Sequence, residues 1–208
     1  MPKVKFDREE IINTTFELLK NDGIRGISAR NIAKKMKSST APIYAHFENI
    51  AVLKKEVINM AKDVLVNYLE RMYTDRKMLN TAMGVVIFAR EQKELYRSIF
   101  LIDADFKSIF ERAVLKILET SRDDERFEHF DRNETMNIIL KIWYYLHGYA
   151  TLVCTEFIKN PTDEEIKNKI LEVATIFISD ALDKKLTAII NKNRGEFFCL
   201  FFCLKNFL

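Results

Sequence analysis

The stretch Ser28–Phe47 reads SARNIAKKMKSSTAPIYAHF, a pattern that predicts two short helices joined by a tight turn. Ser28 can cap the first helix, because a serine hydroxyl accepts a hydrogen bond from a free backbone amide of the first turn. Ile32 and Met36 follow four residues apart. They therefore share one helix face, and we expect that face to be buried.

The second helix of this pair is expected to follow a turn at residues 37–39. Ser39 is expected to cap it, and Pro42 lies in its first turn, where the missing N–H of proline costs nothing. Ile43 and Phe47 are again four residues apart and are expected to point inward. The pattern is that of a helix-turn-helix. The residues left facing outward are Arg30, Thr40, Ala41, Pro42, Tyr44, Ala45 and His46.

The charge of this region is one-sided. Between Gly23 and Phe47 there is no acidic residue, and the basic residues are Arg25, Arg30, Lys34, Lys35 and Lys37. Such a face attracts the phosphate backbone of nucleic acid. The alternative interpretation is a solvated basic face on an ordinary helical bundle.

The segments 32–36 (IAKKM) and 39–47 (STAPIYAHF) resemble the DNA-binding signature of the TetR/AcrR family of bacterial transcription regulators. The preceding segment resembles it too, with FELL at 16–19, Gly23 and GIS at 26–28. The resemblance covers residues 7–57, about a quarter of the chain. The rest of the chain is similar to that family in length and in helical layout.

Two positions depart from the family pattern. The turn between the short helices often carries Gly-Val in the family, and here it is Lys37-Ser38. The next helix often opens with a lysine that binds phosphate, and here that position is Ile50. The first change is expected to add a contact with the DNA backbone and the second to remove one. Lys54 and Lys55 are candidates to replace the lost contact.

The DNA contacts follow from docking the second helix of the pair, residues 40–47, in a major groove. Thr40, Ala41 and Pro42 would meet base edges, and Arg30 is the best candidate for a bidentate contact with guanine. Five further residues would hold phosphates and fix the register; they are Ser28, Lys37, Ser39, Tyr44 and His46.

Composition predicts an all-α protein of about nine helices. The 208 residues are 48% hydrophobic, enough for a real core, and five Gly and three Pro leave little room for loops. The net charge is only +3, but residues 1–60 hold eleven Lys and Arg against seven Asp and Glu, and the remainder holds 22 against 23. The positive field therefore belongs to the N-terminal head.

Several classes of protein are disfavoured. An odd number of cysteines, Cys154, Cys199 and Cys203, and the lack of a signal-peptide pattern favour a reducing cytoplasm. No apolar run reaches the roughly 18 residues of a membrane span. No metal, phosphate-loop or hydrolase motif is present, so we expect neither an enzyme nor a cofactor or metal.

The chain divides into a helix-turn-helix head at 1–50, a helical ligand-binding and dimerisation body at 51–194, and an apolar tail of unknown role at 195–208. Asp7 with Glu10 is expected to cap the first helix, whose buried stripe would be Ile12, Phe16 and Leu19 and which would end at Gly23. The further helices are expected at about 49–73, 76–91, 93–102, 105–120, 133–159 and 163–191. The 49–73 helix, with an apolar stripe that ends at Met72, would link head and body.

Aromatic residues are dense in the body, and two interpretations of them stay open. They are either plain core or the lining of an apolar ligand cavity inside the bundle. The candidates for ligand binding are Phe88, Phe100, Phe106, Phe110, Trp143, Tyr144 and His147. The charged segment 121–132 is expected to be a loop, and it could overhang the entrance of such a cavity.

The last long helix is apolar on two faces, one starting at Ile166 and the other at Leu171. A helix that is apolar on two sides must be covered on both, by its own domain and by a second copy. The resemblance implies the same, because family members dimerise through their last two helices. Gly148 lies inside the preceding helix, where we expect close approach of another helix to compensate for its cost.

These observations predict a dimeric, sequence-specific DNA-binding transcriptional regulator that recognises a near-palindrome and acts as a repressor released by a small hydrophobic ligand. The alternative is a helical ligand-binding or adaptor protein that has lost DNA recognition, which the absence of a cation at Ile50 would suit. The sequence does not specify the operator, the effector, the regulated genes or whether the regulator represses or activates them.

Overall fold

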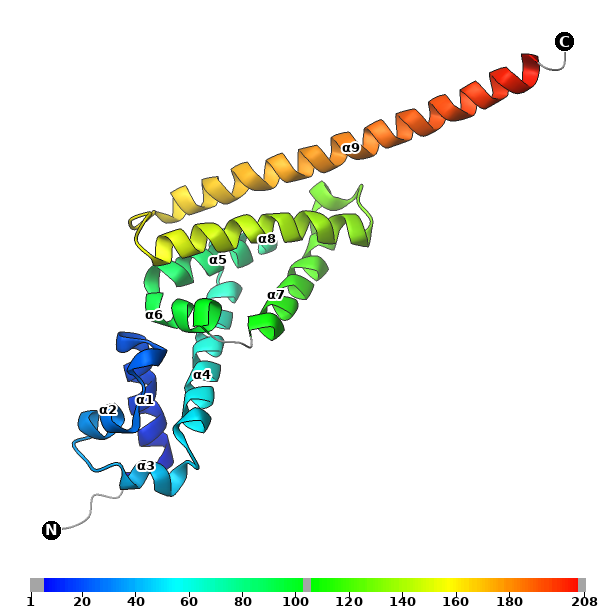
Figure 1. The fold of residues 1–208 in the computed structure, drawn as a ribbon. Helices are drawn as coiled ribbons and strands as arrows, with labels where there is room; N and C mark the ends of the chain where they lie inside the picture. Colours follow the sequence, from blue (N-terminus) through cyan, green and yellow to red (C-terminus); the bar gives the residue numbers. More distant parts are fainter. Residues whose placement is uncertain (1–5, 103–105, 206–208) are drawn as a thin grey trace.

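The computed structural model describes residues 6–102 and 106–205, and in this part the protein is an elongated, all-helical molecule (Figure 1). The head comprises α1 (Arg8–Asp22), α2 (Ala29–Lys35) and α3 (Ala41–His46), and α4 (Ile50–Glu70) leads from it into the body. The body contains α5 (Lys77–Glu91), α6 (Lys93–Tyr96) with a π-helical turn (Arg97–Ile102), α7 (Phe106–Thr120), α8 (Arg132–Cys154) and α9 (Asp163–Lys205). The all-α fold expected from composition is confirmed.

Side chains that bond to backbone amides set most of the helix starts. Asp7 and Glu10 form the expected capping box of α1, and the Asn49 carboxamide accepts the amide of Val52 at 3.1 Å to start α4. A capping box at Asp131, not anticipated from the sequence, starts α8. Gly23 ends α1 at φ 67°, a left-handed conformation in which glycine costs little.

Head and body share one hydrophobic core. The buried cluster runs from Ile11 in α1 through Leu53 and Val57 in α4 to Phe88 in α5 and Ile170 in α9. In α1 the fully buried stripe is Ile11, Thr15, Leu18 and Leu19, whereas the expected Ile12 and Phe16 are only half-buried against it. Because the core is continuous, a displacement of body helices can be transmitted to the head.

Three expectations about the helices of the body were wrong. Met72 is 87% exposed, because α4 ends at Glu70 and its stripe stops at Tyr68. The last helix continues to Lys205 instead of ending near residue 191, and the side chains of 192–205 are not described. The helix expected at 133–159 ends at Cys154. Among the described residues nothing approaches Gly148, since a Cβ there would meet no atom within 4 Å, so a close approach at Gly148 stays a prediction for a partner copy.

The glycine that allows two helices to approach is Gly84 in α5. A Cβ on Gly84 would lie 2.3 Å from the carbonyl oxygen of Tyr68 at the end of α4. No real side chain tolerates that distance, so this position requires glycine to bring α4 and α5 together. This contact between α4 and α5 holds the C-terminal end of α4 within the body.

Candidate nucleic-acid interface

The first helix of the helix-turn-helix is built as its sequence indicates. The Ser28 hydroxyl accepts the amide of Asn31 at 3.2 Å and caps α2. Ile32 and Ala33 of α2 are buried, as are Ile43 of α3 and Phe47 directly after it, and all four belong to the shared core. The apolar faces of α2 and α3 thus meet the rest of the head, and their polar faces remain outside.

The turn after α2 is a Schellman motif with a lysine at its left-handed position. The amide of Ser38 donates to Ala33 O at 2.9 Å, and the amide of Lys37 donates to Lys34 O at 3.1 Å. This pair of bonds requires a left-handed backbone conformation at the residue directly after the C-cap of α2. Lys37 occupies that position and adopts φ 51°. Glycine is the usual occupant because it lacks the Cβ that makes this conformation costly. Lys37 therefore occupies this turn under backbone strain, with its side chain exposed.

The start of α3 differs from the expectation. Thr40 immediately precedes α3, has helical dihedral angles and makes no side-chain cap bond, so Ser39 does not cap the helix. The carbonyl of Thr40 accepts the amides of Ile43 and Tyr44 at 3.1 and 3.4 Å. Proline in the first turn supplies the local restraint instead, and α3 spans Ala41–His46 rather than 40–47.

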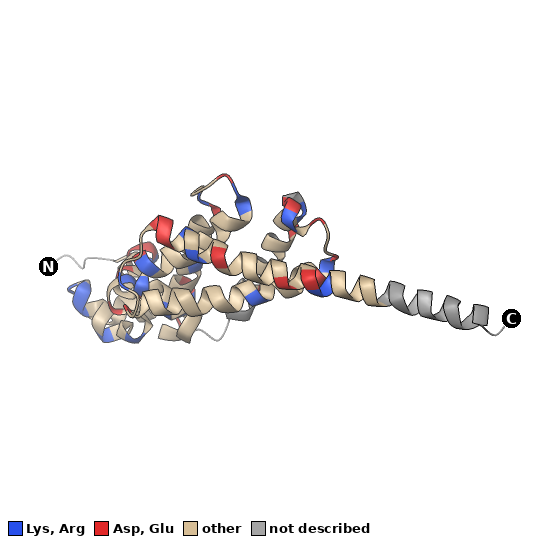
Figure 2. Cartoon of the chain, turned by 90° about the horizontal axis from the view of Figure 1, so that it is seen from above, with Lys and Arg blue, Asp and Glu red and all other residues tan. Residues whose placement is uncertain are grey.

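The nine residues predicted to contact DNA all lie on this helix-turn-helix, and none of them is buried. Ser28, Thr40 and Pro42 are partly exposed, and the exposed ones are Arg30, Lys37, Ser39, Ala41, Tyr44 and His46. Tyr44 exposes 54% of its surface although its ring is large and apolar. Figure 2 shows Lys and Arg gathered at the end of the molecule that carries the head. Their contact with DNA stays a prediction.

Contacts that the sequence did not indicate hold this surface in place. His46 Nε2 donates to the carbonyl of Phe6 at 3.1 Å, which ties the end of α3 to the segment before α1. Arg8 forms an ion pair with Glu56 of α4, and its guanidinium lies 5.0 Å from the centre of the Phe47 ring. These pairs are remote in sequence, so no local pattern reveals them.

Ile50 is the first residue of α4, is half-buried and packs against the shared core. Its side chain is therefore used for packing at the position where the family often has a phosphate-binding lysine. Lys54 lies one turn later and is partly exposed, and Lys55 is exposed. The structure leaves both lysines on the surface of α4.

The candidate ligand residues in the body form a chain of aromatic contacts. Phe88 is buried and meets the Tyr68 ring edge-on at 5.4 Å. Phe110 lies 5.2 Å from Trp143, which stacks with His147 at 6.2 Å between ring centres. His147 also lies 5.8 Å from Phe100, in the π-helical turn.

Two candidates lie outside this chain. Tyr144 is 68% exposed, because it faces away from the core side of α8 where Trp143 and His147 lie. The side chain of Phe106 is outside the described residues. Whether any of these aromatic residues binds a ligand stays a prediction.

A polar contact lies within this apolar cluster. The hydroxyl of Tyr96, which sequence reasoning missed as a site residue, is 3.3 Å from His147 Nδ1 and 3.2 Å from Thr151 Oγ1. Burial lowers the pKa of His147 and raises the pKa of Tyr96, so both groups are held neutral near pH 7. Neutral groups of this kind can bind the polar end of a largely apolar molecule.

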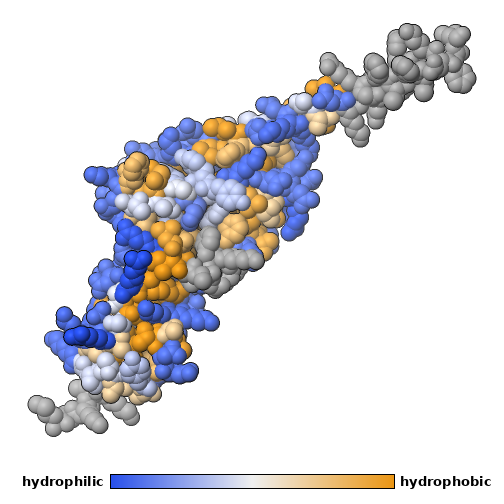
Figure 3. All heavy atoms as spheres, viewed as in Figure 1, coloured by the Kyte–Doolittle hydropathy of each residue, from blue (hydrophilic) through white to orange (hydrophobic). Residues whose placement is uncertain are grey.

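The two long helices carry exposed apolar residues that nothing in the described part of the chain covers. Figure 3 shows apolar patches interrupting the hydrophilic surface along α9. On α8, Tyr144, Gly148 and Leu152 are exposed at four-residue spacing, so they share a face. The exposed apolar side chains of α9 in the described part are Ile176, Leu186, Ile189 and Ile190.

The two apolar faces expected on α9 are not buried as two separate rows. The first face was Ile166, Ile170, Val173 and Phe177, and the second was Leu171, Ala174, Ile178 and Leu182. The buried residues are Ile166 and Ile170 of the first face and Ala174 and Ile178 of the second, and the other four are half-buried. No helix within the described residues combines the length and apolar character needed to cross a membrane.

Comparison with known proteins establishes the fold. A crystal structure from Rhodococcus sp., described as a TetR-family transcriptional regulator, matches with a TM-score of 0.56 and 13% sequence identity. The match covers 82% of this chain and 98% of the other. No protein-family model and no curated protein matches the sequence. At 13% identity the likeness shows a shared all-helical architecture.

Proposed function

We propose that the protein is a dimeric, sequence-specific DNA-binding regulator of transcription, a repressor that a small hydrophobic ligand releases from DNA. The observation that carries the proposal is the surface of the helix-turn-helix. It presents the start of α3 and the cations Arg30 and Lys37 to solvent, and no acidic residue lies between Gly23 and Phe47. This combination of shape and charge suits a DNA major groove.

In this proposal α3 lies in the major groove with its N-terminal end toward the bases. Ala41 and Pro42 open the helix and contact base edges together with Thr40, and Arg30 on α2 recognises guanine. The flanking residues hold phosphates, namely Ser28, Lys37, Ser39, Tyr44 and His46. The bond between His46 Nε2 and the Phe6 carbonyl fixes the imidazole at the edge of the surface and leaves only Nδ1 for a phosphate.

The second copy would pack on the exposed face of α8 and α9. Gly148 supports this assignment: it is exposed, and a Cβ there would meet no atom within 4 Å in the described part of its own chain. Glycine flanked by Tyr144 and Leu152 leaves a shallow position where a partner helix can approach closely. A two-fold interface of this kind buries the same face of both protomers, and it would present two α3 helices to two half-sites of a near-palindrome.

The effector would occupy the aromatic chain between α5, the π-helical turn and α8. Its apolar part would pack on Phe100 and Trp143, and Tyr96 and His147 would bind its polar end. π-Helical turns often occur at functional sites, which supports this location. Release from DNA requires that the effector favour a conformation with a different spacing of the heads.

A packing contact between body and head offers a route for this change. A Cβ on Gly23 at the end of α1 would lie 2.5 Å from a carboxylate oxygen of Glu94 in α6. On the other side of α6, the Cys154 thiol of α8 donates to the carbonyl of Lys93 at 3.5 Å. A shift of α8 relative to the π-helical turn would therefore push on α1.

Selection of bound duplexes from a random DNA pool by the purified protein tests the proposal. Enrichment of an inverted repeat is the expected result and would supply a probe for effector screening. A variant with Arg30→Ala and Lys37→Asn is the matched control and should enrich nothing. If the wild-type protein enriched no sequence at low salt, the adaptor alternative would replace DNA recognition.

A further inference from the structure

A pocket lies at the end of the body farthest from the head, between α7, the following 3₁₀ turns (Ser121–Asp123 and Glu125–Phe127) and the start of α8. Its volume is about 300 Å³, at the lower end of the range for small-molecule sites. It is separate from the aromatic chain around His147, and it is lined by Leu118, Ser121, Arg122, Phe127, Glu128, Phe130, Arg132 and Thr135.

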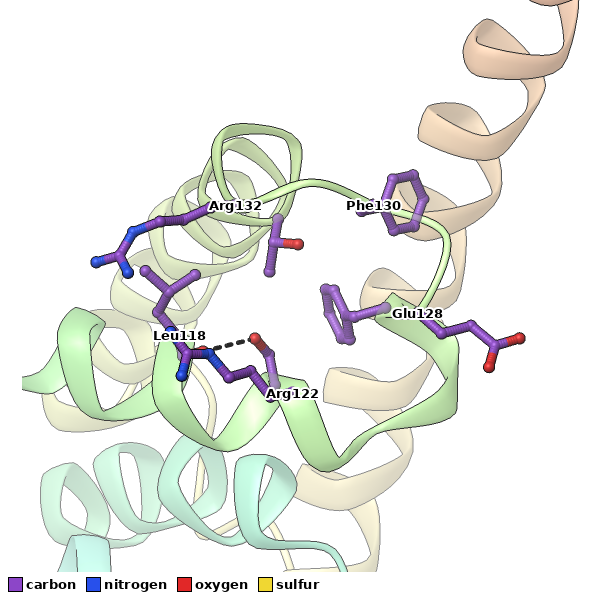
Figure 4. Close-up of a pocket in the computed structure, with 8 residues that line it drawn as sticks. Leu118, Arg122, Glu128, Phe130 and Arg132 are labelled. Atoms are coloured by element: carbon purple, nitrogen blue, oxygen red, sulfur yellow. Dashed lines mark hydrogen bonds between the residues drawn. The ribbon is translucent and has the colours of Figure 1, made fainter.

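Two arginines at this pocket, Arg122 and Arg132, form no ion pair with any side chain that the structure describes. Figure 4 shows both reaching toward the same side of the pocket, near Leu118, whereas Glu128 points away. Two guanidinium groups on one rim form a site for an anion, since each can donate two parallel hydrogen bonds to a carboxylate.

Three of the neighbouring carboxylates are already engaged elsewhere. Glu128 lies 3.1 Å from His129 Nε2, and Glu134 accepts a bond from Lys185 Nζ at 2.6 Å. Asp131 accepts the backbone amides of Asn133 and Glu134 as the cap of α8. They leave the arginines free for a ligand, but their charge favours a ligand with a single negative charge over a doubly charged one.

A buried hydroxyl in the pocket has no hydrogen-bond partner in the described part of the chain. Thr135 is 5% exposed, and within the described part of the chain its hydroxyl makes no hydrogen bond. Other threonines in these helices, such as Thr15 and Thr151, donate to the carbonyl four residues earlier at 2.7 and 2.8 Å. A buried hydroxyl left without such a bond costs free energy unless another group supplies it.

Apart from Ser121, whose hydroxyl donates to the Leu118 carbonyl at 2.8 Å, the remaining lining of the pocket is apolar. Leu118 and Phe127 are buried, and the Phe130 ring lies 6.4 Å from that of Phe127. We infer that this pocket binds a small organic acid, whose carboxylate is held by Arg122, Arg132 and the Thr135 hydroxyl and whose apolar part packs on Phe127 and Leu118. This site is independent of DNA binding and of the effector site around His147.

Isothermal titration calorimetry of the full chain with octanoate, octanol and inorganic phosphate tests the inference. Octanoate should bind one molecule per chain, about tenfold or more tighter than octanol, because charge-assisted hydrogen bonds add to the apolar contact. Phosphate alone should bind more weakly than octanoate, since it lacks an apolar part. Equal affinities for octanoate and octanol, or no octanoate binding, would overturn the inference.

Variants locate the binding site. The double variant Arg122→Gln/Arg132→Gln should reduce octanoate affinity to that of octanol, and Thr135→Val, which keeps the side-chain shape, should weaken octanoate without changing octanol. Lys159→Gln, which removes an exposed cation between α8 and α9, is the matched control and should have no effect. Octanoate affinity that survives the double variant would place the acid elsewhere and contradict the inference.

Discussion

Replacing Lys37 with glycine separates the two consequences of a lysine in the turn of the helix-turn-helix. At φ 51° the lysine pays the steric cost of a left-handed conformation, roughly 1–2 kcal/mol. Glycine removes that cost but gives the unfolded chain more freedom, which offsets about 0.4–1 kcal/mol. The free energy of unfolding should therefore rise by about 1 kcal/mol, which corresponds to about 2–4 °C in melting temperature for a chain of this size.

The same substitution removes a cation from the proposed DNA surface. Each phosphate contact contributes about 0.9 to the slope of log affinity against log salt concentration. A dimer loses two such contacts, so its slope should become shallower by about 1.8. The variant is thus expected to be more stable than the wild type and to bind DNA more weakly.

Thermal unfolding by circular dichroism and anisotropy of a labelled duplex over a salt series measure the two effects. Lys37→Asn should lose the same slope, because asparagine tolerates the left-handed region but carries no charge. Asn160→Gly, at φ 43° in the body, should leave the slope unchanged. An unaltered slope in Lys37→Gly would refute the phosphate contact, and a lower melting temperature would refute the strain.

Three further predictions test packing, base recognition and titration. Gly84→Ala should lower the free energy of unfolding by roughly 1–3 kcal/mol, because its Cβ would meet the Tyr68 carbonyl. Gly148→Ala should be tolerated by the isolated chain. Equal losses of unfolding free energy for the two variants, measured with denaturant, would contradict this prediction. Arg30→Ala should weaken the free energy of DNA binding by roughly 1–3 kcal/mol and reduce base discrimination at one operator position in competition assays. A uniform loss of affinity across sequences would instead assign Arg30 to a phosphate contact. Burial lowers the pKa of His147, so the unfolded state binds its proton first as pH falls below about 6.5. The wild type should therefore lose stability below that pH, and His147→Gln should lose less; identical pH profiles in denaturant unfolding would count against this role.

Local signals explain what the sequence could predict. Asp7, Asn49 and Thr162 start helices through bonds to amides three residues ahead, and such bonds are visible as short motifs. The helix-turn-helix was predictable for the same reason, since the inward-facing apolar residues of each short helix are four residues apart. Its DNA contacts remain untested predictions.

Tertiary contacts explain what the sequence could not predict. Gly148 and Gly84 both lie inside helices, and only the packing of α4 on α5 shows that Gly84 is the one at a close approach within the described chain. Trp143 and Tyr144 are adjacent, yet Trp143 is buried and Tyr144 exposed, because only the Trp143 side of α8 faces the core. Arg122 and Arg132 meet at one pocket only through the path of the intervening loop.

The mode of DNA recognition is tested most directly by the stoichiometry of the complex with the selected duplex. Sedimentation of that complex, together with affinities for duplexes in which one half-site is scrambled, measures whether two heads bind one inverted repeat. Two protomers per duplex, with an affinity loss on scrambling either half-site, is the result expected of two α3 helices held by an α8–α9 dimer. One protomer per duplex, or equal affinity for the intact and scrambled duplexes, would contradict it.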